Sequence, residues 1–282
     1  MVGGVQKMIG QLNFVFFNWL HFFQNFFTHF NCFCYKTDMQ LFGGDNTVSI
    51  ARDKLTNEVY VIKVPLSNEN SMKCFENECY FYKCQLEHPC ILQNKHVVNR
   101  VNKKMIVLPY LRKGDLFNLV EQVPQIPEAQ IRNIFKQIMD GIAFMHEQHF
   151  LHLDLKLENV LVGDDGCIKI CDFGCSMNTQ LSNRRSYMCG TPAYLSPGRF
   201  YGGHVFSEKD DVYSLGVMLY IMVYKQYPWP QDNDQDPQTR LDVSYTPTLY
   251  SEHLMNLIQQ MLMFHETDRI SVRDILLHPF CV

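Results

Sequence analysis

The sequence lacks the features that mark several other classes of protein. It has no block of like charges, and 25 Lys and Arg against 29 Asp and Glu give a formal net charge of −4, so no large basic field points to nucleic acid as a partner. It has no internal repeat. Its 11 cysteines are scattered, without the paired spacing of a disulfide framework or a structural zinc site. Reduced thiols in the cytoplasm or the nucleus are the simplest interpretation.

Charge is also missing near the N-terminus. No Lys, Arg, Asp or Glu stands between Lys7 and Lys36, and Phe is abundant there. Apolar and polar residues recur in steps of three and four, which predicts a helix within a Phe-rich extension, residues 1–34. The polar residues disfavour a signal peptide and a membrane span. Two interpretations stay open: a helix packed on the following domain, which we favour, and membrane association through residues 12–33, which lacks the usual Lys and Arg.

The rest of the chain divides into a strand-rich part and a helix-rich part. Alternating residues at 47–51, 59–64 and 105–108 predict short strands, and one helix accompanies them. From Glu128 onward apolar residues recur with helical spacing, and further helical stretches follow around 212–224 and 253–264. We therefore predict an α+β fold with two lobes, residues 35–108 and 109–282, joined near Pro109.

The strongest chemical signal is the segment His-Leu-Asp-Leu-Lys-Leu-Glu-Asn at 152–159, followed by Asp-Phe-Gly at 172–174. Phosphoryl transfer needs oxygen ligands that hold Mg²⁺ on the phosphates and a carboxylate that receives the hydroxyl proton. Asp154 and Asn159 stand five residues apart, and Asp172 follows thirteen residues later, across a turn at 163–166. A hairpin of that length can return Asp172 to the side of Asn159.

With these motifs the sequence resembles the eukaryotic-type protein kinase family over about residues 35–280, and somewhat resembles its calmodulin-dependent and energy-sensing branch. The resemblance implies a small antiparallel β-sheet lobe with one helix, a larger mainly α-helical lobe, and ATP with Mg²⁺ between them. It also implies transfer of the ATP γ-phosphate to Ser or Thr hydroxyls of protein substrates. Asp154 would be the catalytic base, Lys156 would contact the γ-phosphate, and Asn159 and Asp172 would bind Mg²⁺.

The ATP-anchoring lysine of that family matches Lys63, which stands 15 residues after Val48. Its expected partner is a Glu on the next helix. Glu78, 15 residues after Lys63, is our choice, and Glu76 is the alternative because the stretch to His88 is one residue longer than usual. For each charged residue the plain alternative is a solvated charge.

The phosphate-covering loop is degenerate, because Leu-Phe-Gly-Gly-Asp-Asn-Thr-Val at 41–48 replaces the family pattern G-x-G-x-x-G-x-V. By resemblance, the nucleotide would contact this loop, the following strands, the segment that joins the lobes and the strand after the catalytic loop: Leu41, Gly43, Gly44, Val48, Val61, Leu108, Pro109, Leu111 and Leu161. Plain core packing is compatible with these roles. We count Asp115 and Glu158 with this site. They match positions that attract basic residues of the substrate ahead of the phosphorylated Ser or Thr; the alternative is that both are simply solvated charges.

The segment that receives the substrate matches Gly-Thr-Pro-Ala-Tyr at 190–194, where Thr191 would bridge the catalytic Asp and Lys. Gly198 replaces a Glu that normally pairs with the Arg matched by Arg269, so a buried Arg269 needs another partner. Leu153 replaces an Arg that, in many members of the family, receives a phosphate on the activation segment. We therefore expect activity that does not depend on that phosphate.

The predicted function is thus a protein serine/threonine kinase. The alternative is a pseudokinase, in which the same fold serves as a nucleotide-binding scaffold or interaction module. The degenerate loop, Leu153 and Gly198 motivate this alternative. The enzyme is favoured because all four residues that would anchor ATP, hold Mg²⁺ and receive the proton are present: Lys63, Asn159, Asp172 and Asp154.

Overall fold

The structure is a computed structural model that describes residues 35–43, 46–181, 189–201, 205–229 and 249–282. Three parts named above lie outside the described residues: the Phe-rich extension, Gly44 of the degenerate loop, and the portion of the activation segment at residues 182–188, ahead of Thr191. None of the helices in the described ranges combines the length and the apolar character needed to cross a bilayer.

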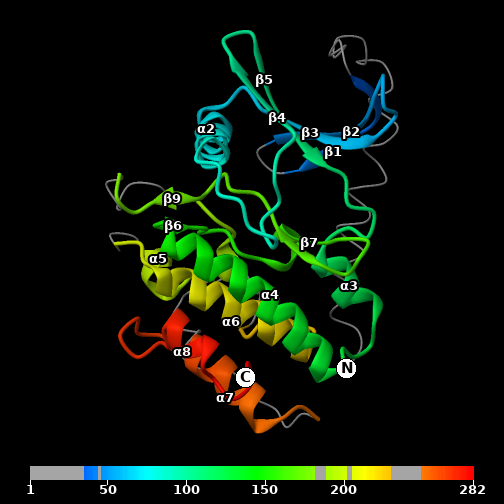
Figure 1. The fold of residues 1–282 in the computed structure, drawn as a ribbon. Helices are drawn as coiled ribbons and strands as arrows, with labels where there is room; N and C mark the ends of the chain where they lie inside the picture. Colours follow the sequence, from blue (N-terminus) through cyan, green and yellow to red (C-terminus); the bar gives the residue numbers. More distant parts are fainter. Residues whose placement is uncertain (1–34, 44–45, 182–188, 202–204, 230–248) are drawn as a thin grey trace.

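The N-terminal part of the described chain is an antiparallel sheet with the strand order β1-β2-β3-β5-β4 (Figure 1). Its strands are β1 (Tyr35–Gly43), β2 (Asn46–Asp53), β3 (Val59–Pro65), β4 (His96–Arg100) and β5 (Lys103–Pro109). The register places Val48 opposite Lys63 and Val61 opposite Leu108. Because side chains alternate between the two faces of a strand, Lys63 shares the face of Val61, which packs against the main hydrophobic core.

One helix, α2 (Glu69–Lys83), accompanies the sheet, as predicted. The Asn68 side chain caps it by accepting a hydrogen bond from the Ser71 N–H at 2.8 Å. Its buried side includes Phe75, Glu78 and Tyr82, which recur at steps of three and four. A carboxylate therefore lies within an otherwise apolar stripe, where burial is costly without a cationic partner.

The C-terminal part is mainly helical, with α4 and α6 side by side at its centre and α7 and α8 below them (Figure 1). Its helices are α3 (Leu116–Gln122), α4 (Glu128–Glu147), α5 (Pro197–Tyr201), α6 (Glu208–Tyr224), α7 (Glu252–Met261) and α8 (Val272–Leu276). The apolar stripe predicted from Glu128 onward is the buried face of α4. Helix α6 begins with a capping box between Ser207 and Asp210, and it is buried almost throughout.

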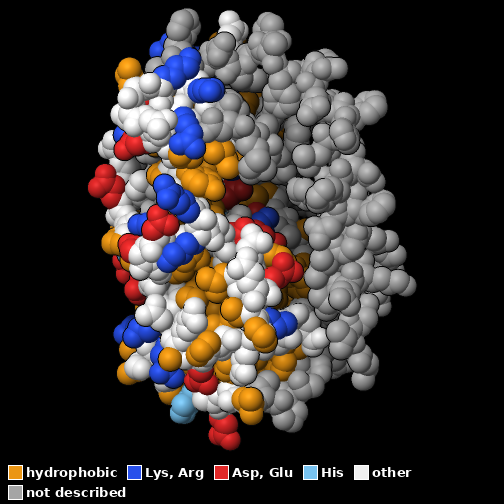
Figure 2. Space-filling model, turned by 90° about the vertical axis from the view of Figure 1, so that its right-hand side faces the viewer, with side chains coloured by type: hydrophobic (Ala, Val, Ile, Leu, Met, Phe, Trp, Pro, Cys, Tyr) orange, Lys and Arg blue, Asp and Glu red, His pale blue; other side chains and the backbone are white. Residues whose placement is uncertain are grey.

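Short strands and turns between the two parts carry most of the motif residues named above. The 3₁₀ turn η1 (Leu157–Asn159) leads into β7 (Val160–Val162), which pairs with β8 (Ile168–Ile170). Strand β6 (Phe150–Leu151), which precedes η1, pairs with β9 (Met177–Asn178), and the 3₁₀ turn η2 (Pro192–Tyr194) precedes α5. On the face drawn in Figure 2, Lys and Arg side chains are interspersed with Asp, Glu and hydrophobic ones in the part of the surface that is described.

Candidate active site

Lys63 joins three segments that are far apart in sequence. It lies on β3 and is only 6% exposed. Its Nζ is 2.7 Å from Oε2 of Glu78 on α2 and 2.7 Å from Oδ1 of Asp172. Glu78 is therefore the partner that the chain uses, whereas Glu76 forms a surface ion pair of 3.4 Å with Lys104.

The two carboxylates keep this buried lysine charged. Burial alone would lower the pKa of Lys63, but the charges of Asp172 and Glu78 outweigh it and raise that pKa. Burial likewise would raise the pKa of Asp172, but the Lys63 charge lowers it to about 2. A protonated Lys63 and an ionised Asp172 are the forms that can act on phosphate and on a metal ion.

Phe173 fixes the backbone next to Asp172. Its ring is fully buried and stacks on Phe81 of α2, with centroids 3.8 Å apart and planes at 14°. Tyr82 meets it edge-on at 5.7 Å, and the His152 ring lies 5.5 Å away. Asp172 itself has a positive φ of 63°, a strained conformation that this aromatic packing holds in place.

A second cluster gathers around Asp154. Its Oδ1 accepts hydrogen bonds from the N–H and the hydroxyl of Thr191, both at 2.8 Å. Lys156 Nζ donates to the same Thr191 hydroxyl at 2.8 Å and lies 3.3 Å from Oδ2 of Asp154. Burial would lower the pKa of Lys156, but the Asp154 and Glu158 charges raise it. Thr191 thus links the carboxylate and the ammonium group, as the resemblance implies.

Asn159 connects this cluster to Asp172. Its Nδ2 donates to the backbone carbonyl of Asp154 at 2.8 Å and to Asp154 Oδ2 at 3.2 Å. Its own carbonyl accepts from the N–H of Cys171 at 3.0 Å, which holds the residue before Asp172 against η1. The turn at 163–166 closes the hairpin through a Gly166 N–H to Gly163 carbonyl bond of 2.9 Å, so the chain returns as the spacing predicted.

Asp211 of α6 holds the backbone ahead of Asp154. Its Oδ2 accepts from the N–H of His152 at 2.9 Å, and its Oδ1 accepts from the N–H of Leu153 at 2.8 Å. The His146 ring nitrogen lies 2.8 Å from the same Oδ2. Burial would raise the pKa of Asp211, but the His146 hydrogen bond lowers it, so Asp211 stays an acceptor.

The predicted adenine-contacting residues lie on neighbouring elements. Leu108 is buried in the main core, against which Val61, Leu111 and Leu161 also pack. Pro109 ends β5 and pairs with Tyr60. Leu41 pairs with Val48, and Gly43 pairs with Asn46 at the end of the β1–β2 hairpin. Leu108, Val61, Leu111 and Leu161 thus share one hydrophobic cluster.

Asp115 and Glu158 have partners within the chain. Asp115 caps α3, where its Oδ1 accepts from the Asn118 N–H at 2.8 Å. Glu158 Oε2 accepts from the Tyr194 hydroxyl at 3.4 Å, and burial raises the pKa of Glu158. The sequence pattern did not indicate the capping role of Asp115, although an Asp just before a helical stretch is a usual N-cap signal.

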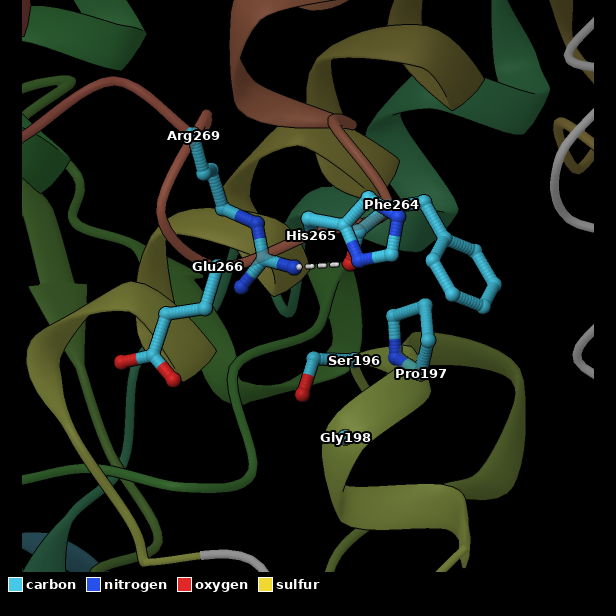
Figure 3. A pocket seen from close by; sticks show the side chains of 7 residues that line it. All are labelled: Ser196, Pro197, Gly198, Phe264, His265, Glu266 and Arg269. Atoms are coloured by element: carbon cyan, nitrogen blue, oxygen red, sulfur yellow. Dashed lines mark hydrogen bonds between the residues drawn. The ribbon is translucent and has the colours of Figure 1, made fainter.

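Arg269 is buried and finds partners other than a glutamate. Its Nε and Nη2 donate to the carbonyl of Met263, Nη1 donates to that of Lys209, and Nη2 also donates to that of Phe264. Its guanidinium lies 4.8 Å from the centroid of the Tyr213 ring. Beside it is a cavity of about 250 Å³, which Figure 3 shows between α5 and the loop before Arg269. The cavity is lined by Ser196, Pro197, Gly198, Phe264, His265, Glu266 and Arg269.

Sequence reasoning missed one buried residue in this region, Arg199 of α5. Its guanidinium donates to the carbonyls of Leu153 and Cys189, which stand shortly before Asp154 and Thr191 in the chain. The available signal was an Arg directly after the Gly198 departure, together with the lack of an Arg at position 153.

Comparisons with known proteins agree with this geometry. A family model described as the protein kinase domain matches residues 40–281. The chain is 31% identical over 252 residues to the Serine/threonine-protein kinase SRK2J of Arabidopsis thaliana, covering 85% of this chain and 73% of that protein. It is 30% identical over 242 residues to the Serine/threonine-protein kinase kin-29 of Caenorhabditis elegans, covering 84% and 29%. With the human NUAK family SNF1-like kinase 2 it shares 31% over 194 residues, covering 68% and 31%. The chain thus spans from less than a third to about three quarters of these relatives' lengths.

Proposed function

The chain belongs to the protein kinase family, with the domain of an ATP-dependent serine/threonine kinase, and from this premise we propose that its own residues carry out γ-phosphate transfer from ATP to a protein hydroxyl. The observation that carries the proposal is the double pairing of Lys63 with Glu78 and Asp172, each at 2.7 Å. This pairing fixes a cation beside the carboxylate that would bind the metal ion. The two lobes would be residues 35–108 and 109–282.

Asp154 is the proposed base that receives the proton of the acceptor hydroxyl. Thr191 holds one of its oxygens through two hydrogen bonds, and Asn159 and Lys156 contact the other. These contacts orient the carboxylate, so little reorganisation is needed when the hydroxyl arrives. Lys156, kept protonated, supplies positive charge where the transferred phosphoryl group gains negative charge.

The residues present fit a magnesium ion bound to ATP. Asp172 Oδ1 bonds to Lys63, while its side chain remains 41% exposed overall. The amide of Asn159 donates through Nδ2, which leaves its Oδ1 as an acceptor. A carboxylate and an amide oxygen suit Mg²⁺, which usually takes few protein ligands and completes its shell with phosphates and water. The described residues contain no cluster of three or more His, Cys, Asp or Glu side chains able to hold a metal. When bound, the ion would neutralise phosphate charge.

ATP would be held at its two ends by different residues. Lys63 would contact the phosphates beneath the β1–β2 hairpin, near the backbone of Gly43. Val48, Val61, Leu108 and Leu161 would enclose adenine, and the backbone of Pro109 and Leu111 would bond its edge. Leu41 and Gly44 belong to the same proposed site.

Protein substrates with a Ser or Thr acceptor are the proposed partners, with a weak preference for basic residues ahead of the acceptor near Asp115 and Glu158. A cytoplasmic or nuclear location is proposed from the scattered cysteines; the nine described ones are free thiols. Membrane association through residues 12–33 remains the less favoured alternative to packing on the domain.

The test uses the full chain with Mg²⁺-ATP and a generic basic protein. We expect phosphate transfer that disappears in Asp154→Asn, while that variant still binds nucleotide. Asp164→Asn, an exposed carboxylate on the β7–β8 turn, is the matched control and should behave like the wild type. Nucleotide binding without transfer by the wild type would support the pseudokinase instead, and the absence of both would refute the proposed site.

A further inference from the structure

The buried guanidinium of Arg199 joins the two chain segments that form the Asp154 cluster. Arg199 lies on α5 and is 6% exposed. Its Nη1 donates to the Leu153 carbonyl at 2.7 Å, and its Nη2 donates to the Cys189 carbonyl at 2.6 Å. The guanidinium also lies 5.2 Å from the centroid of the Phe206 ring. Arginine suits such a bridge because its planar fork presents donors in fixed directions.

The first carbonyl belongs to the residue directly before Asp154. Leu153 has a φ of 63°, which is unfavourable for a branched side chain. Its N–H is held by Asp211 at 2.8 Å, and its carbonyl is held by Arg199. The charged side chains of Asp211 and Arg199 thus hold the N–H and the carbonyl of the strained Leu153. Because Leu153 directly precedes Asp154, these two contacts also fix the orientation of the Asp154 side chain.

The second carbonyl stands two residues before Thr191. Between them, Gly190 has a φ of 101°, and a Cβ added there would lie 2.7 Å from the Leu153 carbonyl oxygen and 3.1 Å from Nη2 of Arg199. The two segments therefore approach so closely that only glycine fits. Thr191 then donates its two hydrogen bonds to Asp154.

We propose that Arg199 is a positioning residue, which ties the Leu153 and Cys189 carbonyls together and so keeps Asp154 and Thr191 in register without a phosphate. The inference rests on the proposed kinase function. With Leu at position 153, the chain lacks the cation that many members of the family carry beside the residue matched by Asp154. Arg199 supplies a cation from α5 instead. Its donors bind carbonyls that are always present, so the arrangement does not wait for a modification.

Two substitutions and one matched control test this in the full chain. Arg199→Met removes the donors but keeps an apolar side chain of similar length, and Arg199→Lys keeps the charge on a single nitrogen. Arg269→Met is the control, because Arg269 is also buried, also donates to carbonyls and also lies over an aromatic ring, but contacts neither Leu153 nor Cys189. For each variant, kcat, KM for ATP and the hydrogen-exchange rate of the Thr191 amide are measured.

Because misplaced catalytic groups cost about a hundredfold, Arg199→Met should lower kcat by about tenfold or more while KM for ATP stays within about twofold. In Arg199→Met the Thr191 amide should also exchange its hydrogen faster than in the wild type. The exchange rate in Arg199→Lys should lie between those of Arg199→Met and the wild type. A kcat within about threefold of wild type with unchanged Thr191 exchange would overturn the inference. Equal losses in Arg269→Met would also overturn it, because they would show only general destabilisation. If the wild type shows no Asp154-dependent transfer, the proposed function fails, and the Thr191 exchange rates alone decide whether Arg199 holds the register.

Discussion

The cavity beside Arg269 leads to a prediction about stability that is independent of catalysis. Gly198→Glu places a carboxylate on the first turn of α5, at the rim of the cavity that Gly198 and Arg269 both line. Four hydrogen bonds account for four of the five guanidinium N–H groups, and the remaining one is on Nη1. Arg269 is buried, and this burial lowers the pKa of its guanidinium. A carboxylate that reaches this N–H should therefore stabilise the fold.

The expected gain follows from three terms. A hydrogen bond to a charged group contributes about 1.5–3 kcal/mol. Replacing Gly by Glu within a helix adds about 0.5–1 kcal/mol of helix propensity. Ordering the Glu side chain costs about 1.5–2 kcal/mol, and the nearby Glu266 carboxylate, which also lines the cavity, opposes the new charge. We expect a net gain of about 1 kcal/mol, which corresponds to a rise in Tm of about 2–4 °C.

The assay is thermal and denaturant unfolding of a small set of variants. Gly198→Ala reports the backbone effect, and Gly198→Gln reports the effect of a neutral side chain of the same shape. The difference between Glu and Gln should vanish in an Arg269→Met background, as a double-mutant cycle would show. If Glu is no more stabilising than Gln in the presence of Arg269, then the cavity does not bring a carboxylate to the guanidinium and the reasoning is wrong.

Four further predictions concern the active site. Lys63→Met should remove most of the phosphate transfer through kcat while leaving the circular dichroism spectrum unchanged, since Lys63 is proposed to act on phosphates in the transition state; activity within a few-fold of wild type would assign this task to another lysine. Asn46→Gly should retain ATP binding in a nucleotide titration, because Asn46 Oδ1 is buried without a hydrogen-bond partner among the described residues; a large loss would reveal a role for the side chain. Although burial opposes it, the Lys63 charge lowers the pKa of Asp172 to about 2, below the ordinary 3.8. The stabilisation is therefore present above the ordinary pKa and lost as the pH falls from about 4 to about 2, so the unfolding free energies of wild type and Asp172→Asn should converge over that range and differ by a constant amount above it. Phosphatase treatment of active protein should leave transfer unchanged, whereas a drop of about a hundredfold, or about 2.7 kcal/mol of barrier, restored by rephosphorylation, would show that an activation-segment phosphate is required.

Local spacing determined much of the candidate site. Asp154, Asn159 and Asp172 come together because a short hairpin brings the chain back, and hairpin lengths are readable from the positions of turn residues. The α+β order of elements was also predictable, since strand and helix periodicities are local properties of the chain. The capping box of Ser207 and Asp210 was not predicted, although it acts within one helical turn and is therefore also a local signal.

The tertiary structure decided which of several similar residues meet. Glu76 and Glu78 differ by about 200° around α2, so only the rotation of the whole helix against the sheet selects Glu78 for Lys63. Spacing to Lys63 suggested one of them, but the rotation depends on the packing of the entire buried stripe of α2. The position of His88 could not resolve this choice.

The long-range contacts of the two buried arginines could not be predicted from the sequence. Arg199 reaches the Leu153 carbonyl from 46 positions away, and Arg269 reaches the Lys209 carbonyl from 60 positions away. Their acceptors are backbone carbonyls, which every residue possesses, so no residue type signals the partner in advance. The sequence alone identified the groups proposed to do the chemistry, whereas the tertiary structure determined what holds them, because buried donors pair with whichever acceptors the folded backbone presents.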